Sequence, residues 1–158
     1  MRTTMINPHT RHVHDIEEWA VSARDLLHEC VASTRSEEIE RLREMVLLLR
    51  AAPMSLSGYA RVPQTEAIEA LLDCGAAFSA AMSIIDEEAN FILSRGRNGI
   101  CLVSMVQPGE TRELTAEART VSLALLAALL TVLIVGAERA CDGIMRAPEP
   151  LAVGRRMH

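Results

Sequence analysis

Apolar residues recur along most of the chain at alternating gaps of three and four positions, the spacing that places side chains on one face of an α-helix. The first such series runs from Val13 to Cys30 and predicts a helix. Two starts are open for it: Asn7 followed by Pro8, or Asp15 with Glu18 three residues on. The pattern fixes the helix but leaves its first residue between these two.

A second helix is predicted after Thr34. Thr34 and Glu37 have the spacing of a capping box, and apolar residues follow at helical gaps from Ile39 to Leu49. Glu37 and Arg41 are spaced for a surface ion pair. The helix is expected to end near Arg50, because a proline follows closely and residues 54–64 are rich in serine, glycine and proline. This stretch is the longest predicted linker.

The third series is the most regular in the chain. It begins after Thr65 and places apolar or small residues at gaps of three and four from Ile68 to Ile92. Such a long alternation is typical of one amphipathic helix. Its glycine and alanine positions would let a neighbouring helix approach closely.

An alternative divides this series at Gly75 and replaces its later part with strands over 78–85 and 89–95. The dipeptide Asn98-Gly99 favours it, because Asn-Gly between two apolar runs is a strong signal for a β-hairpin. The arms of that hairpin would be residues 91–97 and 100–106. The regular spacing of the third series favours the helix over this alternative.

A fourth helix is predicted from Leu114 onward, with Thr111 as its cap and an end before Pro148. Within it, the segment from Val121 to Ala137 contains nothing more polar than a serine and a threonine. A helix that is apolar all the way round is either the centre of a core or a membrane span. The segment falls just short of the ~20 apolar residues that a span needs, so the core is the preferred interpretation.

Taken together, these elements predict an all-α, four-helix bundle-like domain over residues 1–147 with a very hydrophobic C-terminal helix, followed by a flexible basic tail over 148–158. The alternative fold class is α+β, with the hairpin around Asn98-Gly99 packed on helices. Composition favours the helical version, because only 3% of the residues are aromatic and the rest of the chain is rich in helix formers. A length of 158 residues fits one domain.

The net charge and the spacing of the cysteines indicate which partners and which cellular compartment to expect. The net charge is −5, so the chain has no overall basic field for a phosphate backbone, and nucleic acid is disfavoured as a partner. The four cysteines lie far apart with no C-x-x-C pair, which predicts free thiols. With no apolar leader at the start, the expected location is the cytoplasm.

Polar side chains with metal-binding chemistry gather in the first predicted helix. Asp25 and His28 are three residues apart and are the candidate metal ligands. The apolar face of that helix leaves most of its carboxylates towards solvent, and Glu87 and Glu88 have no histidine three residues on. We therefore predict no metal site, no catalytic residues and no cofactor.

The function expected from the sequence is non-enzymatic: protein–protein interaction or homo-oligomerisation by a helical domain. An apolar content of 49% can exceed what a small domain buries internally, and leftover apolar surface marks interfaces. The first alternative is a small membrane-anchored or membrane-active protein that uses residues 121–137. The second is a helical protein that binds a metal or another ligand.

Overall fold

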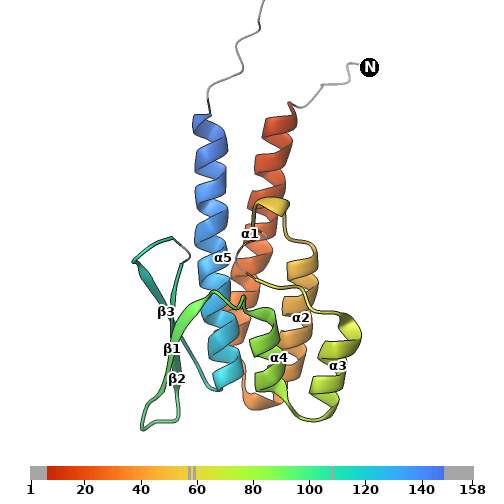
Figure 1. Cartoon of the computed structure of the whole chain (residues 1–158), viewed down its shortest axis with the longest axis vertical. Coiled ribbons are helices and arrows are strands. Elements are labelled where there is room, and N and C mark those ends of the chain that lie inside the picture. The colour runs from red at the N-terminus through yellow and green to blue at the C-terminus, as the bar shows by residue number, and fades with distance from the viewer. Residues whose placement is uncertain (1–6, 57, 59, 108, 148–158) are drawn as a thin grey trace, which may run out of the picture.

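The computed structural model describes residues 7–56, 58, 60–107 and 109–147, which form a helical body with one small sheet. Figure 1 shows α5 in the middle of the molecule, with the sheet on one side and α2, α3 and α4 on the other. The helices and 3-10 turns are α1 (Pro8–Ala32), η1 (Arg35–Glu37), α2 (Glu38–Arg50), η2 (Met54–Leu56), α3 (Thr65–Asp73), α4 (Ala77–Ile84) and α5 (Val121–Arg146). The strands are β1 (Asn90–Arg95), β2 (Cys101–Val106) and β3 (Glu113–Ala118).

The core is built around α5. This helix contacts α1, α2 and α4 as well as β2 and β3, and residues on all of its faces are buried in its N-terminal half. α1 runs antiparallel to α5, and the two helices extend together beyond the rest of the body (Figure 1). The apolar stripe of α1 packs in the core, as predicted, with Trp19 and Leu26 beside it.

The sheet is an antiparallel meander in the order β1-β2-β3. Its side chains alternate between two faces, and the alternate positions of β2 and β3 that lie on the α5 side are buried. The hairpin between β1 and β2 closes through the N–H of Gly96, which donates to the carbonyl oxygen of Ile100 at 2.9 Å. Gly99 has a φ of 80°, which suits a three-residue hairpin loop with a bulge.

The prediction of one long third helix is wrong. The chain leaves the helix after Asp73 because Gly75 adopts a φ of 72°, and the N–H groups of Gly75 and Ala76 bond back to the carbonyls of Leu72 and Leu71. A second, separate helix α4 follows, and then the edge strand β1. The alternative was therefore right about the break at glycine and about the hairpin, but residues 77–84 are helical and not a strand.

The predicted start of the fourth helix is also wrong. Residues 113–118 form β3, in which Leu114, Ala116 and Ala118 alternate with exposed residues. The helix begins at Val121, and its cap is Thr120 in place of Thr111, with the Thr120 side chain accepting from the N–H of Leu123. The all-α bundle is thereby corrected to a mostly helical fold with a small antiparallel sheet, which fits the α+β alternative.

Several predicted boundaries are confirmed. α1 starts at Pro8 and not at Asp15, with the Asn7 side chain accepting from the N–H of His9. In the predicted capping box, the Thr34 N–H donates to the Glu37 carboxylate at 2.7 Å, and α2 ends at Arg50. The helix α5 ends at Arg146, before Pro148. The predicted tail over 148–158 lies outside the described residues.

Helix α5 is the one helix in the described ranges that is long and apolar enough to cross a membrane. Within the most apolar stretch of α5, 78% of the residues are buried inside the fold. The surrounding helices and the sheet thus account for its apolar character by packing.

Candidate functional site

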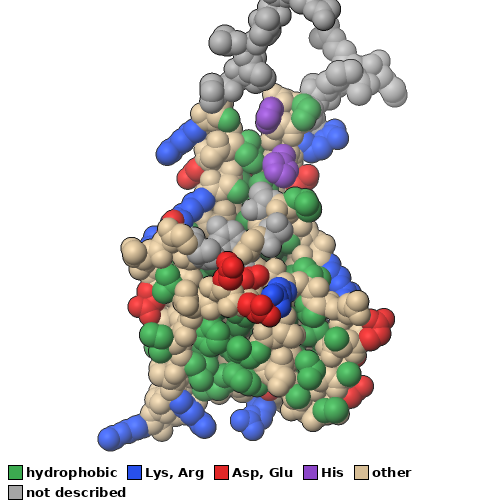
Figure 2. All heavy atoms as spheres, viewed as in Figure 1, with side chains coloured by type: hydrophobic (Ala, Val, Ile, Leu, Met, Phe, Trp, Pro, Cys, Tyr) green, Lys and Arg blue, Asp and Glu red, His purple; other side chains and the backbone are tan. Residues whose placement is uncertain are grey.

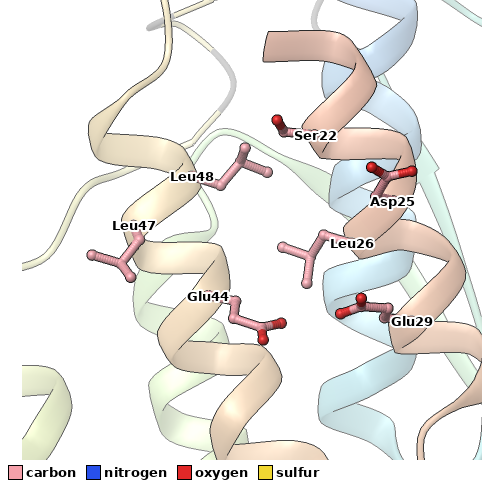
Figure 3. A pocket seen from close by; sticks show the side chains of 7 residues that line it. All are labelled: Ser22, Asp25, Leu26, Glu29, Glu44, Leu47 and Leu48. Atoms are coloured by element: carbon pink, nitrogen blue, oxygen red, sulfur yellow. The ribbon is translucent and has the colours of Figure 1, made fainter. Parts of the chain in front are cut away.

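An open groove of about 470 Å³ runs between α1 and α2 (Figure 3). Ser22, Asp25 and Glu29 reach it from α1, and Glu44 reaches it from α2. Leucines from both helices line the rest: Leu26, Leu47 and Leu48. The groove is acidic because three of its seven lining residues are carboxylates.

Arg41 forms ion pairs with Glu29 and Glu44, two of the carboxylates that line this groove. Its side chain is only 12% exposed and forms ion pairs with Glu29, Glu40 and Glu44. Burial raises the pKa of Glu44. The charge of Arg41 lowers this pKa, whereas the charges of Glu29 and Glu40 raise it. The pKa of Glu44 therefore lies above its ordinary value. Burial lowers the pKa of Arg41, but the same carboxylates raise it above its ordinary range. This arrangement is an ion cluster that joins α1 to α2, and within the described residues the Nε of Arg41 and the Oε2 of Glu44 are buried in it without a hydrogen-bond partner.

The buried thiol nearest this cluster is not a nucleophile. Burial raises the pKa of Cys30 to about 12, a shift that the nearby Arg41 only partly offsets. A thiol is reactive as its thiolate, so Cys30 is inert at neutral pH and acts as a small core residue.

The structure does not assemble the predicted metal candidates into one site. Asp25 is exposed and lines the groove, whereas His28 is exposed and is not among the groove-lining residues. Ligand atoms of His14, Asp15 and Glu18 do lie close together on α1, but all three side chains are exposed. Exposed acidic groups of this kind are common without a metal.

The second feature is β1, one of the two edge strands of the sheet. β1 pairs with β2 on one side, and its residues are exposed except for Phe91, which is half-buried. Ile92 is 68% exposed and Leu93 is 41% exposed. Soluble proteins usually protect an edge strand with a charge, a proline or a bulge, because unpaired backbone groups recruit other strands. The stretch from Asn90 to Ser94 has none of these.

Apolar side chains also gather beside this edge. Figure 2 shows hydrophobic side chains over the lower part of α5, between the sheet and α4. Phe91 and Leu93 lie on the α5 face of the sheet, opposite Met105 and Val103 in the register. On α4, Phe78 is 47% exposed although it belongs to the predicted apolar series. We call Phe91, Ile92 and Leu93 of β1 the edge surface, in which Phe91 and Leu93 lie on the α5 face of the sheet and Ile92 lies on the opposite face.

Opposite charges lie at the two ends of β1. The segment that leads into the strand contains Asp86, Glu87 and Glu88, and Arg61 forms ion pairs with the first two of these. At its other end are Arg95 and Arg97, and both are exposed. The strand therefore has an acidic start and a basic end.

Comparison of the chain with protein-family models, with curated proteins and with solved structures finds no match. Sequence reasoning did not identify the edge surface, because Ile92 fits the apolar stripe of the predicted long amphipathic helix. The available signal was the uncharged run Phe91-Ile92-Leu93-Ser94 directly before the Asn98-Gly99 turn.

Proposed function

We propose that the protein is a non-enzymatic interaction module that associates with protein through the edge surface. The observation that carries this proposal is the edge strand β1, whose Ile92 and Leu93 are exposed beside a row of backbone groups that pairs with no other strand in the described part of the chain. Addition of a strand to such an edge is a recurrent mode of protein recognition, because main-chain hydrogen bonds supply affinity and side chains supply specificity.

The groove between α1 and α2 supports an enzymatic role less well. Its carboxylates are engaged with Arg41 or exposed, and Cys30 is protonated at neutral pH. Within the described residues, all four thiols are free, which supports the expected reducing, cytoplasmic location.

A second candidate function, membrane association, rests on the length and hydropathy of α5. For this function α5 would have to leave its contacts with α1 and the sheet and expose its buried leucines to lipid. Fractionation of the full chain separates the two candidates: the interaction module stays in the supernatant without detergent, whereas a membrane protein pellets and resists carbonate extraction.

The direct test is the mass of the full chain in solution by light scattering over a range of concentrations. We expect an oligomer for the unaltered chain and a lower mass for Leu93→Glu, because a buried carboxylate opposes association. Val21→Glu is the matched control, since Val21 is 55% exposed on α1 and lines a groove shared with Ala137 and Glu138 of α5. An equal loss of mass in both variants contradicts the proposal. The proposal is also contradicted by a chain that is a monomer at all concentrations and has no other protein bound to it.

A further inference from the structure

We infer that the occupant of the β1 edge is a second copy of this chain, which pairs β1 with β1 across a two-fold axis at Leu93. This inference rests on the proposed function and names its partner and register. The product is a continuous six-stranded antiparallel sheet in which the same surface is used by both copies.

The directions of the backbone groups limit the registers. In an antiparallel ladder, residues alternate between pairs that exchange hydrogen bonds and pairs that do not. The N–H of Gly96 donates to the carbonyl oxygen of Ile100, the residue before β2, so counting back along β1 places the N–H and C=O groups of Ser94 and Ile92 towards β2. Those of Phe91, Leu93 and Arg95 therefore point to the free edge.

A symmetric dimer must pair these outward groups with one another. With the axis at Leu93, Leu93 meets Leu93 of the second copy, and Phe91 meets Arg95 in both directions. All three outward residues then exchange hydrogen bonds within the bounds of β1. An axis at Ile92 or at Ser94 leaves one outward residue without a partner inside the strand, so the Leu93 axis satisfies the most backbone groups.

The charges at the ends of β1 fit the same arrangement. Because the strands are antiparallel, the basic end of one copy, Arg95 and Arg97, lies beside Glu88 of the other copy, whereas Asp86 and Glu87 pair with Arg61 of their own chain. The contact occurs twice by symmetry. Complementary charges of this kind favour one orientation and disfavour others.

Burial supports an added strand. α5 covers β2 and β3 on one face of the sheet, whereas β1 has β2 as its chief contact and leaves Leu93 exposed. A second β1 strand would extend the sheet on the side of the edge surface and bring Leu93 of each copy against its counterpart. Apolar surface and unpaired backbone groups are then removed from water together.

Disulfide formation between copies tests the register. Three variants are made in a Cys74→Ser background: Leu93→Cys, Ile92→Cys and Ser94→Cys. In each variant, the new cysteine faces its own counterpart only if the two-fold axis passes through that position. Directly opposed residues of a hydrogen-bonded pair have Cα atoms about 5.5 Å apart, which a disulfide spans. We expect mild oxidation to link Leu93→Cys several times faster than the other two, although Ile92 is the more exposed position in the monomer.

The outcomes distinguish this inference from the proposed function. Faster linkage at position 92 or 94, or equal rates at all three, in a chain that is still a dimer overturns the register and leaves the interaction module standing. A chain that is monomeric by light scattering and links at none of the positions overturns the homodimer, and the interaction module falls with it when the monomer also has no other protein bound to it.

A charge exchange provides an independent measurement. Arg97→Glu and Glu88→Arg should each weaken dimerisation by about two- to fivefold, as expected for exposed ion pairs. The double variant restores opposite charges across the interface and should recover most of the affinity. A double variant that is no tighter than either single variant contradicts the antiparallel arrangement.

Discussion

Leu93 of β1 lies directly opposite Val103 of β2, yet Val103 is fully buried whereas Leu93 is 41% exposed. Both side chains are on the same face of the sheet. The difference arises because α5 packs on β2 and β3 but not along β1. The sheet is therefore wider than the helix that covers it, and the uncovered strand is the one that ends at the Asn98-Gly99 hairpin.

The direction of the N–H groups along β1 can be tested with proline. Leu93→Pro removes an N–H that points to the free edge, so the domain should still fold while self-association is lost. Ser94→Pro removes an N–H that faces β2 and should destabilise the fold itself. Thermal unfolding and light scattering of the two variants measure these effects. A Leu93→Pro variant that unfolds as readily as Ser94→Pro contradicts the assigned directions.

Trp19 joins α1 to the end of α2. Its indole N–H donates to the carbonyl oxygen of Leu48 at 2.9 Å, in the last turn of α2, where carbonyls lack helical partners. Trp19→Phe keeps most of the packing and removes this bond, so we expect a loss of about 1–2 kcal/mol in the free energy of unfolding. Urea denaturation measures it, and an unchanged midpoint would show that water replaces the indole.

Thr120 separates β3 from α5. Its hydroxyl accepts from the Leu123 N–H at 3.2 Å and donates to the Glu38 carboxylate at 2.8 Å. Thr120→Ala removes both contacts and should cost about 1 kcal/mol or somewhat more. Thr120→Ser retains the hydroxyl and is the matched control. Equal stability of the alanine and serine variants in urea denaturation is the result that contradicts a capping role.

The ion cluster around Arg41 predicts a pH dependence of stability. Burial, partly offset by Arg41 and reinforced by Glu29 and Glu40, raises the pKa of Glu44 above 4.5 in the folded state. Between 4.5 and the raised value, the folded chain holds more protons than the unfolded chain, so stability falls as pH rises through this interval. Glu44→Gln should remove this component, as measured by denaturation at a series of pH values.

Glu69 provides a control in which stability changes with pH in the opposite direction. Its pKa is lowered by the hydrogen bonds from Arg43, at 2.9 and 2.8 Å, so its contribution is present above 4.5 and is lost as pH falls through the folded pKa. Glu69→Gln should therefore flatten the acid side of the profile and leave the interval above 4.5 unchanged. Identical profiles for the Glu44→Gln and Glu69→Gln variants would refute both assignments.

The elements that the sequence predicted well are those whose signals are local. Asn7-Pro8 begins α1, Thr34 and Glu37 begin the second helical segment, and Arg50 ends it. These caps depend on side chains and backbone groups within a few residues of one another, so neighbouring sequence suffices to place them. The candidate site differs, because the exposure of Leu93 depends on which strands of the sheet α5 covers.

By itself, the sequence determined that the chain is mostly helical, that Thr34 and Glu37 open the second helical segment, and that residues 121–137 form an apolar helix. Only the tertiary structure decided between helix and strand for residues 90–95 and 113–118. Leu114 and Ala118 are four residues apart, and this spacing places two side chains on one face in a helix and in a strand alike. The choice was made by β2, which offers both segments a hydrogen-bonded neighbour, and by α5, which covers the face that Leu114 and Ala118 share.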